Sequence, residues 1–241
     1  MKSYGQFCPV AKAAEVFCER WTALIIRDLA GGPRRFSTLQ RGVPLMSPTL
    51  LSRRLKTLEA EGIVARERGA TGGHWVYRLT PAGAEFAPIV LALGTWGQRW
   101  ARRELEEGEI DLSLYVFAME NSVDATAFGA GRTVVRLELT DQPVAKRLWW
   151  FLNENGGVQL CVDPPGPEID LYIAGALPDM IRLWRGDVSY ARLVDDGRLE
   201  VLGPARLRRA ARRWLGASLL AHVKPAAEAG RVATGAAKAA R

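Results

Sequence analysis

The spacing of apolar residues over the first third of the chain predicts a series of short helices. One apolar stripe recurs at helical intervals, at Val10, Ala13, Ala14 and Phe17. A second stripe follows, at Trp21, Leu24, Ile25 and Leu29. The second helix should end at the glycine-proline turn of residues 31–33, and a short third helix is predicted over residues 36–40.

The segment from Ser47 to Gly62 predicts a helix with two chemically different faces. Ser47 is a good N-cap, Pro48 suits the first helical position, and Gly62 suits the end. At about 100° per residue, one face carries Leu50, Leu51, Leu55 and Leu58. The opposite face carries Thr49, Ser52, Arg53 and Lys56. Such a helix is either a solvated surface helix or one that lies in a DNA groove.

A hairpin should follow this helix directly, because two β-rich runs flank a glycine-rich turn at residues 69–73. Arg66 and Arg68 alternate with their neighbours, so both arginines share one side of the ribbon. Short helices followed by a basic hairpin are the order of a winged helix-turn-helix. In that mainly α fold, one helix enters the major groove and the wing meets the flanking backbone. The predicted DNA contacts are Ser47, Thr49, Ser52, Arg53, Arg54, Lys56, Arg66 and Arg68.

Arg54 differs from the other predicted contacts, because it points between Leu50 and Leu51 toward the edge of the core. Anchoring a neighbouring residue or a phosphate suits this position better than reading a base.

Residues 80–105 predict one long amphipathic helix that begins with a Thr80 cap and Pro81, with a kink at Pro88 as a possibility. Its apolar face is too rich for the surface of a small domain. That face consists of Phe86, Ile89, Val90, Leu93, Trp96 and Trp100. We expect a partner subunit to cover it, which gives a homodimer; the alternative is that the second module of the same chain does so.

From about Asp111 the pattern changes to that of an α+β module of sheet and helices. Strands are predicted over residues 112–118, 133–139, 147–152, 158–162 and 171–173. A short helix is expected over residues 178–184, and the module should close with a strand and an amphipathic helix.

The distribution of charge supports two modules. The net charge is +9 over residues 1–103, −10 over residues 104–205 and +8 over residues 206–241. Only the first module should therefore face a polyanion. Residues 223–241 lack a buried-face period and are expected to form a disordered tail. The domain boundaries expected from these patterns are 1–106, 107–222 and 223–241.

The overall composition is that of an ordinary globular protein, with 241 residues, 48% of them hydrophobic and 24% charged. No apolar run approaches the ~20 residues of a membrane span, and the first residues lack the apolar stretch of a signal peptide. Cys8, Cys18 and Cys161 are too widely spaced for a disulfide framework or a zinc site. A reducing cytoplasm is the location that this cysteine usage favours.

The residues of an enzyme are missing from the sequence. His74 and His222 are the only histidines, so no catalytic triad and no zinc cluster is available. The glycines at residues 129 and 131 fall short of a dinucleotide-binding fingerprint and precede a strand, which makes them a turn. We therefore expect no catalytic residues, no cofactor and no metal.

The first hundred residues resemble the HxlR-type family of bacterial winged-helix regulators. The similarity rests on "CPVAKAAEVFCERWTALIIRDL", "GPRRFSTLQRGVPLMSPTLLSRRLKTLE" and "YRLTPAG" and extends over residues 7–104. It implies a dimeric repressor or activator that binds an inverted-repeat operator in double-stranded DNA. It also places Cys8 at the cysteine that some members use for redox sensing. The positive end of a helix dipole favours a thiolate there; a small capping residue without a sensing role is the alternative.

Residues 110–221 resemble the sterol carrier protein type 2-like module in their closing segment, "GDVSYARLVDDGRLEVLGPARLRRAARRWL". That resemblance implies a fold around an apolar cavity for a lipid-like small molecule. Candidate lining residues, which could equally be ordinary core, are Trp149, Trp150, Tyr172, Trp184 and Tyr190.

Two interpretations of the second module follow. If it senses an apolar effector, it should enclose an apolar cavity. If it serves only for dimerisation or partner docking, with regulation by protein level or Cys8, it should have a filled core and a flat apolar interface.

Overall fold

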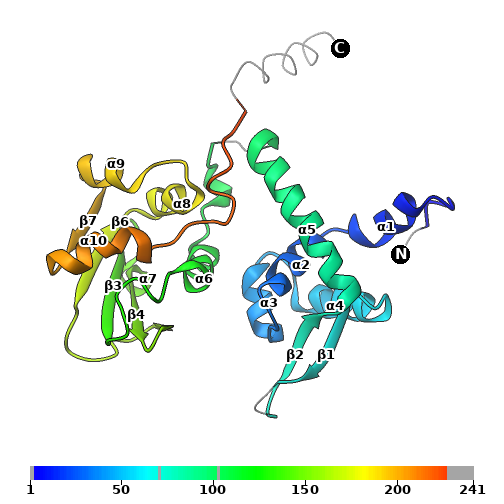
Figure 1. The fold of residues 1–241 in the computed structure, drawn as a ribbon, viewed down its shortest axis with the longest axis horizontal. Coiled ribbons are helices and arrows are strands. Elements are labelled where there is room, and N and C mark those ends of the chain that lie inside the picture. Colours follow the sequence, from blue (N-terminus) through cyan, green and yellow to red (C-terminus); the bar gives the residue numbers. More distant parts are fainter. Residues whose placement is uncertain (1–2, 70–71, 102–103, 227–241) are drawn as a thin grey trace, which may run out of the picture. The chain divides into compact units, whose positions relative to one another are not determined.

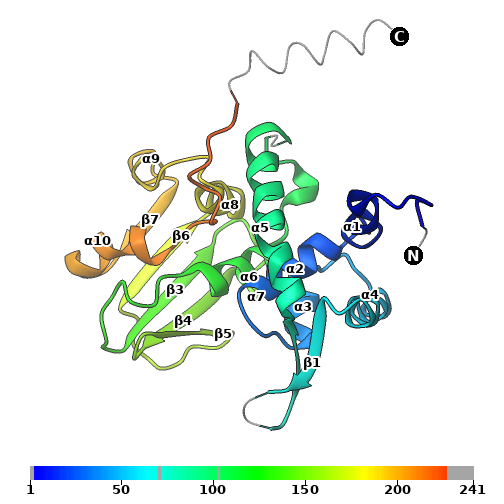
Figure 2. The same cartoon turned by 45° about the vertical axis from the view of Figure 1, so that its right-hand side comes forward.

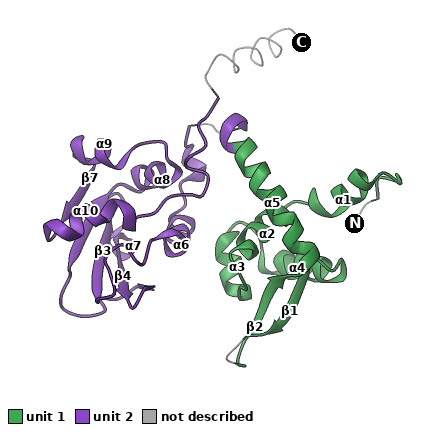
Figure 3. Cartoon of the chain, in the orientation of Figure 1, with its two compact units in different colours: residues 1–97 green, residues 98–241 purple. Residues whose placement is uncertain are grey.

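The computed structural model describes residues 3–69, 72–101 and 104–226 (Figure 1). The chain divides into two compact units, Met1–Gly97 and Gln98–Arg241, which Figure 3 shows in separate colours. Most of the tail expected over residues 223–241 lies outside the described residues. Each unit is considered by itself.

The first unit is a winged helix-turn-helix, as the sequence predicts. Its elements are α1 (Pro9–Phe17), α2 (Thr22–Ala30), α3 (Phe36–Gly42), α4 (Pro48–Ala60), β1 (Val64–Arg68), β2 (Trp75–Leu79) and α5 (Pro81–Trp96). One buried cluster joins α2, α3 and α4 to the base of the hairpin, and it includes Ile25, Ile26, Leu29, Leu39, Leu51, Leu55 and Leu58. The leucine face of α4 therefore packs inward and leaves the opposite face to solvent.

Local hydrogen bonds fix where α4 and α5 begin. The Ser47 hydroxyl accepts the Leu50 N–H at 3.3 Å, and the Thr80 hydroxyl accepts the Gly83 N–H at 3.1 Å. Gly83 is buried against Ile63, where a Cβ would lie 2.0 Å from the Ile63 carbonyl oxygen. Only glycine lets α5 start this close to the root of the wing.

The wing is a regular antiparallel pair with a third point of attachment. Arg68 lies opposite Trp75, and Arg66 lies opposite Tyr77. Arg34 forms an isolated bridge with Tyr77, in which each backbone N–H donates to the other residue's carbonyl at 2.8–2.9 Å. The bridge ties the wing to the segment that leads into α3, so the hairpin projects from a fixed base.

The second unit has α+β architecture. After a π-helical turn (Gly97–Ala101) and a 3-10 turn (Glu107–Glu109), its elements are α6 (Leu112–Ser122), β3 (Thr133–Leu139), α7 (Val144–Arg147), β4 (Leu148–Glu154), β5 (Gly157–Cys161), β6 (Leu171–Gly175), α8 (Leu177–Arg185), α9 (Tyr190–Asp195), β7 (Leu199–Leu202) and α10 (Ala205–Trp214). The sheet order is β5-β4-β3-β6-β7. Neighbouring strands are antiparallel except for β3 and β6, which are parallel.

Helices α6, α8 and α10 contribute to the same buried cluster as the inward side chains of this sheet. Figure 2 shows the ribbons of these helices and strands. At its centre Trp214 stacks on Phe128 with ring centroids 5.7 Å apart and meets Phe151 edge-on at 5.3 Å. The Trp214 indole N–H donates to the Asn153 side-chain oxygen at 2.7 Å, which satisfies a buried polar group. Large aromatic rings thus fill this part of the core.

The prediction of a strand over residues 112–118 is wrong, because this segment is the helix α6. The Asp111 carboxylate accepts the Leu114 N–H at 2.8 Å and caps the helix. The buried residues Tyr115, Val116 and Met119 recur at the spacing of a helix. The prediction failed because a short apolar run is also compatible with the two-residue repeat of a strand. A further helix, α9, was also not predicted; the Ser189 hydroxyl caps it by accepting the Arg192 N–H.

Candidate nucleic-acid interface

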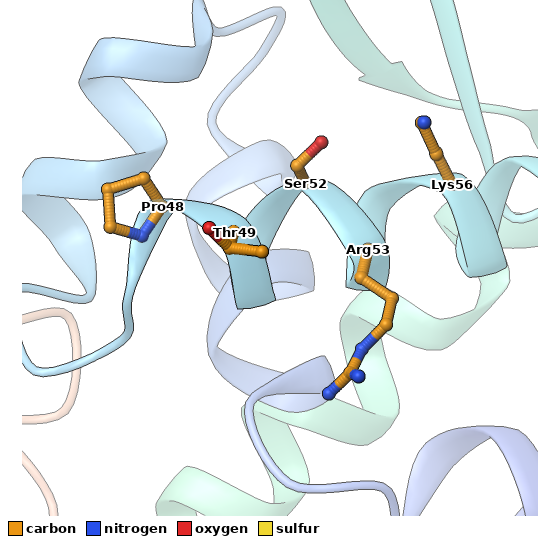
Figure 4. Close-up of a pocket in the computed structure, with 5 residues that line it drawn as sticks. All are labelled: Pro48, Thr49, Ser52, Arg53 and Lys56. Carbon is orange, nitrogen blue, oxygen red and sulfur yellow. The ribbon is translucent and has the colours of Figure 1, made fainter.

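The outward face of α4 is a continuous surface of hydroxyl and cationic side chains. Thr49, Arg53 and Lys56 are exposed, and Ser52 is half-buried. With Pro48, these four residues line an open surface groove of about 510 Å³ (Figure 4). Within the part of the chain that the structure describes, the side chains of Arg53 and Lys56 form no hydrogen bond and no ion pair. Their donors are therefore available to a ligand.

Figure 4 shows that the side chains in this groove divide between two flanks of the helix. Ser52 and Lys56 point to one side, and Arg53 extends to the other. This division follows from the helical repeat, since residues four apart lie one above the other. A ligand that rests along α4 would meet donors on both of its edges.

Arg54 differs from Arg53 and Lys56 because it is engaged inside the first unit. Its guanidinium donates to the Glu19 carboxylate at 2.8 Å, and only 13% of its side chain is exposed. Glu19 lies in the turn between α1 and α2, so the pair fastens α4 to the preceding helices. The physical reason is the direction of the side chain, which leaves the helix at the edge of the leucine face. This is the neighbour-anchoring alternative that the sequence left open.

Ser47 lies at the N-terminal end of the same surface and caps the helix. It is exposed, and its hydroxyl oxygen accepts the Leu50 N–H as the N-cap of α4. The hydroxyl proton is not used in that bond, so Ser47 retains one donor for a phosphate at the start of the helix.

On the wing, Arg66 and Arg68 both lie over the ring of Trp75. Their guanidinium carbons are 4.4 Å and 4.3 Å from the ring centroid, within the range of a cation–π contact. Both arginines are exposed, and so is 42% of Trp75. The ring thus contacts both cations, and neither guanidinium group donates a hydrogen bond to another described residue. Trp75 was missed from the sequence; its position opposite Arg68 in the hairpin register is the signal that would have found it.

The six apolar residues predicted as a dimer interface divide into two groups. Ile89, Leu93, Trp96 and Trp100 are each about half-exposed along α5 and the turn after it. Phe86 instead stacks on Phe17 with centroids 5.5 Å apart, and Val90 packs against the core of the first unit. All six residues fall within about 120° of the helix circumference. Phe86 and Val90 lie at one edge of this arc, where they pack against their own unit.

Cys8 is the N-cap residue of α1 by position only. It is half-buried and forms no disulfide, and its side chain makes no capping hydrogen bond. Its backbone carbonyl accepts the Lys12 N–H at 3.0 Å. The thiol thus has no capping role, in contrast to the structural alternative expected from the sequence.

The five aromatic residues predicted to line a ligand cavity do not meet around one space. Trp149, Trp184 and Tyr190 pack against the buried cluster, whereas Trp150 and Tyr172 stand on the opposite face of the sheet. The Tyr172 hydroxyl donates to Glu138 at 2.9 Å, and burial together with this hydrogen bond raises the pKa of that phenol. An open cavity of about 730 Å³ does lie in the second unit, but none of the five lines it, and its lining includes Asp179, Arg198 and Glu200.

Two kinds of site are absent from the described residues. They contain no group of three or more histidine, cysteine, aspartate or glutamate side chains placed to hold a metal ion. No helix among them is both long and apolar enough to span a membrane.

The order of α2, α3 and α4, the hairpin β1–β2 and the amphipathic α5 define a winged helix-turn-helix protein of the DNA-binding class. Within that class, residues 16–105 match the HxlR-like helix-turn-helix family. The chain is 38% identical over 98 residues to the uncharacterized HTH-type transcriptional regulator YvaP of Bacillus subtilis, covering 40% of this chain and 91% of the relative. It is 32% identical over 113 residues to the regulator YkvN of the same organism, covering 46% and 94%. The chain belongs to the HxlR-like helix-turn-helix family.

Proposed function

We propose that this protein is a sequence-specific DNA-binding transcriptional regulator in which α4 lies in the major groove. The observation that carries the proposal is the α4 groove of Thr49, Ser52, Arg53 and Lys56, whose members face solvent together. The relatives described as HTH-type transcriptional regulators support the general class. The major groove of DNA admits an α-helix and displays a distinct set of donors and acceptors for each base pair.

Within this groove, Arg53 is the residue that we propose reads a base. A guanidinium can donate two parallel hydrogen bonds to the O6 and N7 atoms of guanine, which is worth about 1–3 kcal/mol of discrimination. Arg53 has no partner among the described residues, so no internal contact needs to be broken before it binds. Thr49, Ser52 and Lys56 supply the shorter and more adaptable contacts on either side of it.

In this proposal the wing does not read bases. Its predicted contacts are two arginines, which offer positive charge and N–H donors but no acceptor. Arg66 and Arg68 would meet backbone phosphates, which fix register and contribute affinity for any sequence. Stacking on Trp75 restricts both side chains before binding, so less rotamer entropy is lost when a phosphate arrives.

We also propose that the protein acts as a homodimer on an inverted repeat. Ile89, Leu93, Trp96 and Trp100 follow each other at intervals of four, three and four residues, the spacing of a helix–helix seam. A two-fold dimer would present two copies of α4 to two half-sites of one operator.

The experiment begins with the selection of an operator from a random duplex library by the full chain. Competition between this operator and a scrambled duplex is then measured at several salt concentrations. Arg53→Ala should lose the preference for the operator over the scrambled duplex, by roughly 10- to 100-fold. Arg68→Ala should weaken binding to both and flatten the salt dependence by about one unit of slope. If Arg53→Ala keeps the full specificity ratio, α4 is a solvated face and the proposal fails.

For the second unit we propose a docking or dimerisation role in preference to the sensing of an apolar ligand. Two observations favour this alternative: the aromatic packing around Trp214, and an open cavity that none of the five candidate aromatic residues lines. The test is a melting curve with a long-chain fatty acid and with a sterol. A rise in melting temperature that saturates with either compound would restore the sterol carrier-like interpretation. We propose that the DNA-binding domain comprises residues 1–106 and the second domain residues 107–222.

A further inference from the structure

Helix α10 concentrates positive charge in a unit that is otherwise acidic. Its ten residues contain five arginines and no acidic side chain, and all five arginines are exposed. Residues 104–205, which precede the helix, carry a net charge of −10. The charge of α10 is therefore local to this helix and is opposite to that of the rest of its unit.

Two of the five arginines have a task inside the unit. Arg213 donates to the Asp124 carboxylate at 2.5 Å, and Arg206 donates to the Phe128 carbonyl at 3.1 Å. The remaining three, Arg208, Arg209 and Arg212, form no hydrogen bond and no ion pair with any described residue. They span about 100° of the helix circumference and so make one solvent face. We call these three residues the α10 arginine face.

The α10 arginine face works against the stability of its own helix. Arg208 and Arg212 are four residues apart and Arg209 and Arg212 are three apart, and like charges at these spacings repel. Arg208 lies in the first turn, where the positive end of the helix dipole disfavours a cation, whereas Arg212 lies in the last turn, where the dipole favours one. None of the acidic side chains of the described residues is placed to neutralise the three free arginines. A partner with closely spaced negative charges would remove this repulsion.

We infer that the α10 arginine face docks on the phosphate backbone of double-stranded DNA, as a second contact that the winged helix does not provide. The inference rests on the proposed function, because the first unit brings DNA to the same chain and so raises the local concentration of phosphate. Guanidinium groups bind phosphate oxygens through paired hydrogen bonds. The face offers neither hydroxyls nor amides, so it contributes affinity without base discrimination.

A membrane surface fits this helix less well than DNA does. An interfacial helix must insert an apolar face into the lipid. The apolar residues of α10, Leu207, Ala211 and Trp214, are instead buried in the core of the unit. Only the arginines remain outside, and they can bind a polyanion without any rearrangement of the fold.

The test uses the full chain with Arg208→Gln, Arg209→Gln and Arg212→Gln combined, on a long random-sequence DNA duplex. The logarithm of the affinity is plotted against the logarithm of the salt concentration between about 50 and 200 mM. Three lost phosphate contacts should flatten the slope by about 2.7 units, so that the variant loses roughly 40-fold less affinity than wild type over this range. The preference for the selected operator over a scrambled duplex should stay unchanged.

The matched control removes three exposed cations elsewhere in the same unit, with Arg132→Gln, Lys146→Gln and Arg192→Gln. It should leave the slope close to that of the wild type. A second comparison replaces the α10 arginine face with three lysines, which should retain most of the slope. Should the triple glutamine variant fail to fold, Arg209→Gln alone is expected to flatten the slope by about 0.9 units.

The outcomes separate this inference from the proposed function. If the wild-type chain binds no DNA, both fail together. If operator preference is intact and the α10 variant keeps the wild-type slope, only the α10 contact is overturned, and a different polyanion, such as an acidic protein, becomes its partner. An equal loss of slope in the α10 variant and the control would also overturn it, since net charge alone would then explain the effect.

Discussion

Helices α4 and α10 are both amphipathic and cationic, but their outward faces differ in chemical variety. On α4, the residues that line the groove include a threonine, a serine, an arginine and a lysine. On α10, the free residues are three arginines. Base edges differ from one another in their donors, acceptors and methyl groups, whereas phosphates are all alike. A varied face can therefore discriminate between sequences, and a uniform one can only add attraction.

The two helices also differ in how many of their cations are paired with acidic side chains. In α4, Arg54 is paired with Glu19, whereas Arg53 and Lys56 have no side-chain partner in the part of the chain that the structure describes. In α10, Arg213 alone has an acidic partner among the described residues. Neighbouring arginines in one helix can thus have opposite tasks, and exposure and pairing decide which task each one has.

The largest expected effect concerns the proposed dimer. Operator binding should need two copies of α4, one from each subunit, whereas each α10 should bind phosphate by itself. Leu93→Glu combined with Trp96→Glu should convert the proposed dimer to a monomer of 26.5 kDa, because two carboxylates would lie in the apolar seam. Binding to the inverted repeat should fall by about 100-fold or more, since the second half-site is no longer tethered. The part of random-sequence binding that depends on α10 should persist.

Light scattering and the competition assay check this prediction. The control is Val144→Glu with Leu219→Glu, two apolar residues of the second unit that are more than three-quarters exposed. A wild-type mass of 26.5 kDa at micromolar concentration would contradict the proposed dimer.

A smaller effect should separate the neighbours Arg53 and Arg54. Arg54→Ala leaves Glu19 without its partner and should lower the free energy of unfolding by about 1 kcal/mol, or the melting temperature by about 2–4 °C. Arg53→Ala removes an exposed side chain without a partner and should change stability by less than about 0.5 kcal/mol. Urea unfolding of both variants and of the wild type measures these changes in the free energy of unfolding. Adding Glu19→Gln completes a double-mutant cycle, in which a coupling of zero would show that the ion pair does not stabilise the fold.

The smallest effect concerns Arg213 of α10 and its acidic partner Asp124. Hydrogen bonds from the Thr126 hydroxyl and from Arg213 lower the pKa of Asp124 to about 2. Because this folded-state pKa lies below the usual value of 3.8, the carboxylate stabilises the fold above that value, and the contribution is lost as pH falls toward 2. Asp124→Asn should therefore destabilise the protein slightly at neutral pH, and this difference should shrink between pH 4 and pH 2.

Thermal melts of Asp124→Asn and wild type across this pH range provide the measurement. The effect should be small because the carboxylate is partly exposed and solvent screens the pair. The same variant removes the negative charge beside Arg213, whose hydrogen bond to the Thr126 hydroxyl remains. The DNA-binding slope should therefore steepen by at most about 0.9 units if α10 meets phosphates. A destabilisation that stays constant from pH 7 to pH 2 would show that the carboxylate's charge is not the cause.

Much of the first unit could be predicted from the sequence, because its signals are local. Ser47 with Pro48 and Thr80 with Pro81 fix the starts of α4 and α5, and the spacing of four leucines decides which face of α4 is buried. In the second unit, the strand over residues 133–139 was predicted with its observed bounds. Residues 112–118 were not, since a short apolar run satisfies the period of a strand and that of a buried helix equally well.

The sequence by itself determined the class of this protein, the outward face of α4 and the two-unit charge pattern, since these depend on residue order and helical repeat. Only the tertiary structure decided which cations are free. The partners of Arg54 and Arg213 lie 35 and 89 residues away along the chain, and Trp75 meets Arg66 across a hairpin. Such contacts join residues that are far apart in the sequence, so the local spacing of residues cannot predict them. The same cation is therefore an anchor or a potential ligand contact according to what the fold places beside it.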